Sequence, residues 1–307
     1  MEGFVGRTSE GRALLLSVRA GRSVVLTGPP GYGKTALLRE ALPAMEAWSP
    51  VVWVDRASPF TGFLKELFRG LWEKRVPVPG LERTTDVEAD LKAWSRRHPT
   101  ADDKARGLVR ALKEYAAAGR NPVTVVVDDA SDLRGSAVPW FVALTEAATL
   151  VMGLYAETLK KPSTRRLWTR FDRVDLPPLS PRETRELAEL LVERYGVVAE
   201  DREAYLSRVV SLSGGIPGEV ARLVRYVGPE AVVKGKDTGT AYAQHLARRE
   251  ERGIALAPLL LVASGFAIAA RYLGLARGEM DLYVMGGIGI ASFVVLSPWL
   301  RKAVAAK

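Results

Sequence analysis

The stretch SVVLTGPPGYGKT, residues 23–35, decides the fold. Its short β-branched apolar run predicts a buried strand, which the glycines and prolines of residues 28–33 end in a tight loop. A helix is expected from about Lys34 to Leu42. The loop matches the pattern GxxxxGKS/T in the strand–loop–helix setting that this pattern requires. We therefore predict that the loop binds the phosphates of a nucleotide.

The residue types in this loop suit phosphate chemistry. Glycines let the backbone wrap so that its N–H groups and the positive end of the following helix point at the β-phosphate. Lys34 adds positive charge at the β- and γ-phosphates, and the Thr35 hydroxyl is suited to Mg²⁺. The predicted cofactors are ATP and Mg²⁺. The predicted cofactor-binding residues of this segment are Gly28, Gly31, Tyr32, Gly33, Lys34, Thr35 and Ala36.

Composition narrows the choice of cofactor and partner. The 307 residues include no cysteine and two histidines, which excludes a disulfide framework and a thiolate or imidazole metal cluster. A bound metal is therefore expected to be Mg²⁺ held by oxygen ligands. The formal net charge of +9 fits nucleic acid, anionic lipid or simply a basic surface, and does not choose among them.

Further apolar runs indicate the rest of the sheet. They alternate with helical stretches such as Phe63–Trp72 and Lys104–Ala117. Strands that alternate with helices predict an α/β fold with a parallel sheet, the arrangement of P-loop NTPases. The predicted strands after the first are Val51–Asp55, Val123–Asp129, Leu150–Ala156 and Val174–Leu176.

Two carboxylates end the strand at Val123–Asp129. In a parallel sheet this strand end lies on the same side as the phosphate loop. Asp128 is expected to orient Mg²⁺, and Asp129 stands where a general base would polarise the attacking water. Aspartate has a shorter reach than glutamate, which weighs against fast hydrolysis. The alternative is that both residues cap a following helix.

A second, helical part follows Leu179. Ser180 as N-cap and Pro181 at the first helical position begin the first of three predicted helices, Pro181–Tyr195, Arg202–Ser211 and Pro217–Val227. These helices form a compact lid. The predicted domains are an ATPase core (residues 1–179), the helical lid (180–228), a connector with a basic stalk (229–253) and a transmembrane hairpin (254–307).

The C-terminal segment predicts two transmembrane helices. Ile254–Ala270 is uncharged and continues past Arg271 to Ala276, and Leu282–Leu300 is a second uncharged run of spanning length. A buried helical pair in a soluble domain is the alternative, but such helices usually carry a polar face, and these do not. More cations flank the outer ends of the two spans than the loop between them. The cations at the outer ends are Arg248, Arg249, Arg252, Arg301, Lys302 and Lys307, and those near the loop are Arg271 and Arg277.

These flanks predict a multi-pass membrane protein with two spans and with both termini in the cytoplasm. Nothing in MEGFVGRTSE resembles a cleavable signal, so the ATPase domain is also expected to be cytoplasmic. Anionic headgroups near the stalk would account for part of the positive charge. The lipid bilayer is thus the first predicted partner.

Four motifs in this order resemble the AAA+ superfamily, and within it archaeal-type ATPases related to origin-recognition proteins and the STAND switch ATPases. They are FVGR at residues 4–7, the GPPGYGKT loop, the strand ending in two aspartates, and SGGIPGEV at residues 213–220. The resemblance covers about residues 4–227. It implies that Val5, Gly6, Arg7 and Pro217 contact the base side of the nucleotide.

The resemblance also implies residues that report on the γ-phosphate. Thr158 is the expected sensor after the fourth strand. Arg166 or Arg170 fits a finger acting on a neighbouring subunit, although a solvated basic face explains both equally well. Gly218 stands where an arginine would be expected in the lid, which favours the STAND-like interpretation.

The function predicted is a membrane-anchored ATP hydrolase that remodels, assembles or moves a partner at the cytoplasmic membrane face. Its catalytic residues are Lys34, Asp128, Asp129 and Arg166, and its metal ligands are Thr35 and Asp128. A homo-oligomer, such as a ring, and an unidentified protein are the expected partners. The alternatives are a slow STAND-like nucleotide switch and a membrane-tethered DNA-handling ATPase, of which the latter is favoured least.

Overall fold

The computed structural model describes residues 4–227 and five helical positions further on: 272, 273, 276, 280 and 284. The chain divides into two compact units, residues 1–239 and 240–307. The predicted connector and transmembrane hairpin lie outside the described residues, apart from those five positions. Within the described part of the chain, no helix combines the length and the apolar character needed to cross a bilayer.

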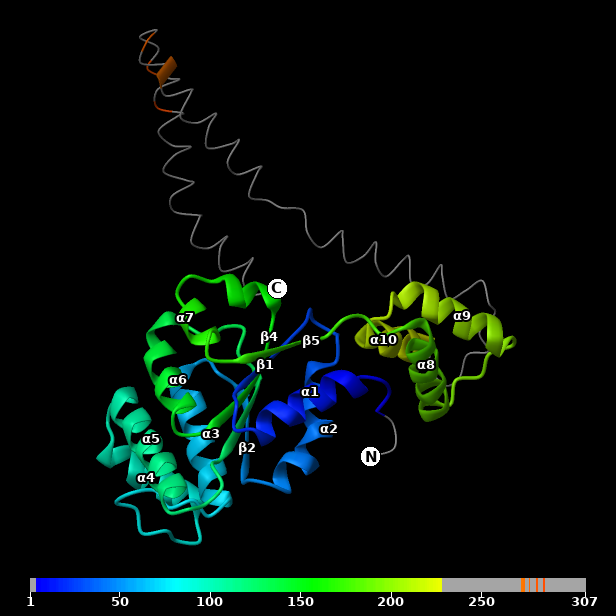
Figure 1. Ribbon diagram of the computed structural model, residues 1–307. Helices are drawn as coiled ribbons and strands as arrows, with labels where there is room; N and C mark the ends of the chain where they lie inside the picture. The colour runs from blue at the N-terminus through cyan, green and yellow to red at the C-terminus, as the bar shows by residue number, and fades with distance from the viewer. Residues whose placement is uncertain (1–3, 228–271, 274–275, 277–279, 281–283, 285–307) are drawn as a thin grey trace. The chain divides into compact units, whose positions relative to one another are not determined.

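The first unit contains a five-stranded sheet in which every described pair of neighbouring strands is parallel, so the α/β prediction is confirmed. The strand order is β2-β3-β4-β1-β5 (Figure 1). Because β1 lies between β4 and β5, the loop that leaves β1 emerges beside the end of β4. The strands are β1 (Val24–Thr27), β2 (Val51–Arg56), β3 (Thr124–Asp129), β4 (Thr149–Leu154) and β5 (Asp172–Asp175).

Helices cover both faces of this sheet, and the central strands β1 and β4 and most of β3 are therefore buried on both sides. Along β3, Val125 and Val127 contribute to one apolar cluster and Val126 to the other, as the two-residue period of a strand requires. The core helices are α1 (Thr8–Arg19), α2 (Lys34–Glu46), α3 (Phe60–Glu73), α4 (Val87–Arg97), α5 (Ala101–Ala117), α6 (Val138–Thr145) and α7 (Arg165–Trp168).

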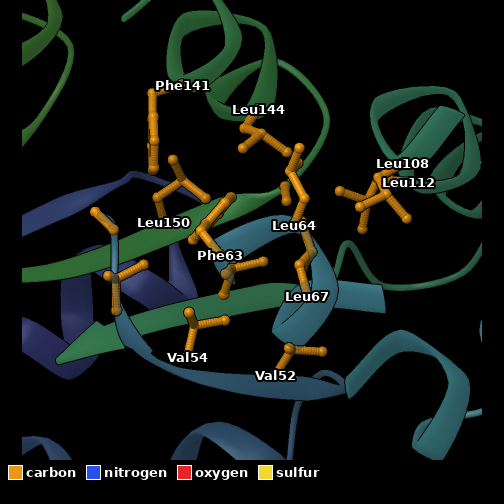
Figure 2. Packing of buried hydrophobic residues seen from close by; sticks show 14 of the residues in the cluster. Val52, Val54, Phe63, Leu64, Leu67, Leu108, Leu112, Phe141, Leu144 and Leu150 are labelled. Carbon is orange, nitrogen blue, oxygen red and sulfur yellow. The ribbon is translucent and has the colours of Figure 1, made fainter. Parts of the chain in front are cut away.

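The larger cluster lies between the sheet and α3, α5 and α6. Figure 2 shows Phe63 and Leu67 of α3 above Val52 and Val54 of β2, with Phe141 of α6 nearby. The Phe63 and Phe141 rings lie 4.8 Å apart. The smaller cluster joins α1 and α2 to the opposite face. The sheet that carries the phosphate loop is therefore anchored on both sides.

The three lid helices are α8 (Pro181–Tyr195), α9 (Arg202–Ser213) and α10 (Pro217–Val227). Helices α8 and α10 have the predicted bounds, and α9 extends two residues beyond the prediction. Ser180 and Glu183 form the reciprocal hydrogen bonds of a capping box at the start of α8. Apolar residues of all three helices, such as Val192, Val209 and Leu223, are buried.

Candidate nucleotide-binding site

The phosphate loop joins β1 to α2 through two glycines in the left-handed region. Gly31 and Gly33 have φ angles of 83° and 88°, which side chains rarely adopt. Gly33 precedes the first residue of α2, so the unpaired N–H groups of the first helical turn lie at the loop. This backbone is suited to an anion such as a phosphate group.

Lys34 is held close to this loop. Its Nζ donates to the Gly28 carbonyl at 2.6 Å and to the Pro29 carbonyl at 3.1 Å. Burial lowers the pKa of Lys34, and the carboxylates of Asp129 and Asp128 act in the opposite direction. A partly buried ammonium with only neutral hydrogen-bond acceptors gains most from an added negative charge.

The carboxylate of Asp128 faces the start of α2. Its Oδ2 accepts a hydrogen bond of 3.1 Å from the Thr35 hydroxyl. Its Oδ1 is buried and finds no hydrogen-bond partner among the described residues. A buried carboxylate oxygen is normally satisfied, and a hydroxyl beside such an oxygen is the kind of ligand set that Mg²⁺ takes. Thr35 and Asp128 therefore fit the predicted metal.

Asp129 ends β3 in a local turn. Its Oδ1 accepts a hydrogen bond from the Ser131 backbone at 2.9 Å. The next helical turn begins only at Gly135. The alternative that Asp128 and Asp129 cap a following helix is therefore wrong, and both carboxylates remain at the sheet edge beside Lys34.

Burial raises the pKa of Asp128, while the Thr35 hydroxyl and Arg39 lower it. The Asp128 carboxylate is therefore protonated at a higher pH in the folded protein than in the unfolded chain. Ionisation of Asp128 at neutral pH costs stability, and that stability returns as the pH falls through the raised pKa.

We expect Asp128→Asn to raise the thermal midpoint of the nucleotide-free protein at pH 7 by roughly 2–4 °C, equivalent to about 1 kcal/mol. Thermal unfolding between pH 5 and 8 measures this change in the midpoint, with the exposed Asp132→Asn as control. A lower midpoint for Asp128→Asn at pH 7 would contradict this reasoning.

The lid touches the phosphate loop through backbone atoms. The Gly218 N–H at the start of α10 donates to the Gly31 carbonyl at 2.8 Å. A Cβ at Gly218 would lie 2.9 Å from the Gly31 Cα, and a Cβ at Gly33 would lie 3.8 Å from the Pro217 ring. Because the two backbones are in contact, any side chain at position 218 would force them apart. This explains physically why no arginine stands there.

Gly218→Ala is expected to push α10 away from the loop, because the backbone that its Cβ meets cannot rotate aside. Overpacking of this kind typically costs about 1–3 kcal/mol. Hydrogen exchange of residues 217–227 and of the loop should become faster, and the thermal midpoint should fall. Gly11→Ala is the matched control, since its Cβ would make an ordinary 3.5 Å contact with Leu37. Unchanged exchange in Gly218→Ala would disprove the contact.

The N-terminal segment contacts both the phosphate loop and the lid. The buried Arg7 donates to the Tyr32 carbonyl of the loop at 3.2 Å and pairs with Glu10 at 3.2 Å. Hydrogen bonds from Ser180, and a further one from the Arg7 backbone, lower the pKa of Glu183 in the lid. Arg7 thus lies where loop, lid and N-terminal segment meet. Its predicted contact with the base stays a prediction, as do those of Val5, Gly6 and Pro217.

The sensor and finger candidates lie in different surroundings. Thr158 is buried, and its hydroxyl donates to the Ser131 carbonyl at 3.4 Å. Tyr155 lies beside Lys34 instead. Arg166 is exposed on α7, and Arg170 pairs with Glu146 at 3.5 Å. The structure therefore brings neither Thr158 nor the arginines to Lys34, and a finger acting on a neighbouring subunit stays a prediction.

Two features of the site were missed by the sequence reasoning. One is Tyr155, for which the signal was an aromatic residue at the end of an apolar strand. The other is the backbone contact between Gly31 and Gly218, for which the only signal was a glycine directly after Pro217. Neither signal specifies its partner.

A phosphate loop after β1 and paired aspartates at the end of β3, on a parallel sheet of this strand order, define a P-loop NTPase. Residues 3–155 match the family model described as AAA ATPase domain. This part of the chain is therefore similar to AAA ATPase domains. No protein of curated function matches the chain significantly.

Two of the solved structures that match the chain illustrate the shared fold. The ORC1 protein of Aeropyrum pernix, solved in complex with DNA, is 16% identical, with a TM-score of 0.54 over 86% of this chain and 72% of that chain. The Walker-type ATPase PABY2304 of Pyrococcus abyssi is 16% identical, with a TM-score of 0.53 over 92% of this chain and 88% of that chain. At this identity the likeness concerns the fold alone.

Proposed function

We propose that this protein is a membrane-anchored ATP hydrolase that remodels, assembles or moves a partner at the cytoplasmic membrane face. The observation that carries the hydrolase part is the buried Oδ1 of Asp128, which has no hydrogen-bond partner among the described residues and lies on the carboxylate that Thr35 contacts. A cation beside the phosphate loop would satisfy that oxygen. Lys34 and Asp129 supply the remaining chemistry.

Each residue has a distinct role in this proposal. Lys34 and the loop N–H groups bind the phosphates of ATP, and Thr35 and Asp128 hold Mg²⁺. Bound Mg²⁺ neutralises negative charge on the phosphates. Asp129 accepts a proton from, or orients, the attacking water as a general base. The Ser131 hydrogen bond keeps the Asp129 carboxylate at the strand end.

An exposed arginine on α7 supports the proposed homo-oligomer. Arg166 is exposed and so is available to a second copy of the chain. A guanidinium supplied from a neighbour stabilises charge on the transferred phosphate group. The active form is therefore proposed to be an assembly in which one subunit completes the site of the next.

Membrane anchoring rests on the amino-acid sequence. The two uncharged runs, residues 254–270 and 282–300, have the length that a spanning helix needs. Flotation of the full chain with liposomes, followed by a high-salt wash, tests this proposal. A variant with Leu260→Glu and Val295→Glu should lose flotation, whereas Arg248→Ala with Arg249→Ala should keep it. Release of the unmodified chain by salt alone would contradict a spanning anchor.

Turnover and mass, measured on one detergent preparation with and without ATP, test the hydrolase and the assembly together. We expect the mass of the particle to increase when ATP is added. We also expect ATP turnover to depend on Mg²⁺. Arg166→Ala should lower turnover in the assembly and leave ATP affinity unchanged. A chain that binds ATP yet stays monomeric and nearly idle would contradict the hydrolase proposal.

The second candidate function is a slow nucleotide switch. The observation that favours it is the direct contact of α10 with the phosphate loop, because a ligand that moves Gly31 also moves the lid. Turnover far below one per minute, together with ATP-dependent protection of the lid from hydrogen exchange, would favour the switch. Handling of DNA ranks last, and steep salt-dependent DNA binding would revive it.

A further inference from the structure

The Lys34 ammonium has an aromatic neighbour. Its Nζ lies 4.7 Å from the centroid of the Tyr155 ring. A cation within about 6 Å of an aromatic face is attracted by the ring quadrupole. The Gly28 and Pro29 carbonyls accept the hydrogen bonds of the same ammonium. Lys34 thus contacts three neutral groups, one of which, Tyr155, directly follows β4 and does not belong to the loop.

The backbone around Tyr155 is fixed at two points. The Tyr155 N–H donates to the Ser131 hydroxyl at 3.1 Å, and the Leu154 carbonyl accepts from the Gly28 N–H at 3.4 Å. The first bond ties Tyr155 to the segment after Asp129, and the second ties its neighbour to the first glycine of the loop. These two bonds fix the backbone from which the Tyr155 ring projects.

Three carboxylates act on the Lys34 ammonium in competition with the phosphate loop. Asp129, Asp128 and Glu157 all attract the Lys34 ammonium. An ammonium drawn onto Asp129 would be lost to the phosphates and would neutralise the general base. No described hydrogen bond joins Lys34 to either aspartate, and the ring contributes to holding Nζ at the loop carbonyls.

We propose that the Tyr155 ring is a positioning group, which holds the Lys34 ammonium at the phosphate loop and away from Asp129, ready for the terminal phosphates of ATP. The face of the ring carries this role, and its hydroxyl does not. This inference rests on the proposed nucleotide site. It deepens that proposal by naming a residue on which ATP affinity depends.

The test uses the full chain in detergent with Tyr155→Phe and Tyr155→Leu, and measures affinity for a non-hydrolysable ATP analogue and for ADP. Tyr155→Phe keeps the ring and should bind the analogue within about twofold of the unmodified chain. Tyr155→Leu should bind it roughly 5- to 30-fold more weakly, the range given by about 1–2 kcal/mol. ADP lacks the γ-phosphate, so Tyr155→Leu should weaken the binding of ADP less than the binding of the analogue.

A second readout separates positioning from general packing. Thermal unfolding without nucleotide is measured for Tyr155→Leu alone and combined with Lys34→Met, which keeps most of the length of the unbranched side chain but not its charge. A ring that holds the ammonium makes Tyr155→Leu less damaging in the Lys34→Met background. Equal damage in both backgrounds would assign Tyr155 to packing only and overturn the inference.

Other outcomes also decide the inference. Equal losses of affinity for the analogue in Tyr155→Phe and Tyr155→Leu would assign the effect to the hydroxyl group and overturn the inference. Tighter binding by Tyr155→Leu would mean that the ring competes with ATP for Lys34, which also overturns it. Failure of the unmodified chain to bind the analogue would defeat the proposed function itself, whereas normal binding that Tyr155→Leu leaves unchanged would defeat only the inference.

Discussion

Asp129→Asn will lower ATP turnover by about two to four orders of magnitude, the contribution typical of a positioned general base. Asparagine keeps the size of the side chain and an oxygen for the Ser131 backbone N–H, so the turn after β3 survives. It removes the group that accepts the proton. ATP affinity should therefore change little, and phosphate release measured at saturating ATP reports the loss.

The control for this variant is Asp132→Asn, an exposed carboxylate three residues further along the chain. Its turnover should stay within about twofold of that of the unmodified chain, as expected for an exposed position away from special features. An Asp129→Asn protein that retains a tenth or more of the turnover would remove Asp129 from the chemistry. Another group would then have to orient the water.

Lys34→Ala will weaken ATP binding by about a hundredfold or more, because loss of one partner of a desolvated charge pair costs about 2–5 kcal/mol. The structure adds a reason specific to this chain. Lys34 brings a positive charge into a partly buried site that also contains Asp128 and Asp129. Without it, the phosphates would meet two carboxylates and no cation from the loop.

Calorimetric titration with a non-hydrolysable ATP analogue and Mg²⁺ measures this loss. Lys65→Ala, an exposed lysine of α3, is the matched control and should bind like the unmodified chain. Lys34→Arg should recover only part of the affinity, since a planar guanidinium cannot replace a compact ammonium beside the same carbonyls. ATP binding by Lys34→Ala within about threefold of the unmodified chain would locate the phosphates elsewhere.

The parts of the fold that local patterns determine could be predicted from the sequence. The run before Gly28 and the loop after it specify β1 and the start of α2 by themselves. Pro181 and its Ser180 cap specify the first lid helix in the same way. The helices that were missed have weaker local signals. Helix α4 is mostly polar, and the short α6 is apolar with no polar face to reveal its period.

The parts of the site that depend on tertiary contacts could not be predicted. Leu150–Ala156 was predicted as a strand, but β4 ends at Leu154, and Tyr155 therefore leaves the sheet beside Lys34. The contact of Gly218 with Gly31 joins residues far apart in the sequence, and no periodicity encodes it. Thr158 was chosen from spacing alone, and its burial beside Ser131 depends on how the β4–β5 connection folds back.

The most direct test of the account is calorimetric titration of the nucleotide-free full chain with ATP analogue, with and without Mg²⁺, for the unmodified chain and Asp128→Asn. We predict that Mg²⁺ tightens binding to the unmodified chain severalfold, because Asp128 and Thr35 hold the metal beside the loop. In Asp128→Asn, binding should be weaker and the same with or without Mg²⁺. Equal Mg²⁺ dependence in both proteins, or no binding by the unmodified chain, would contradict the assignment of this site.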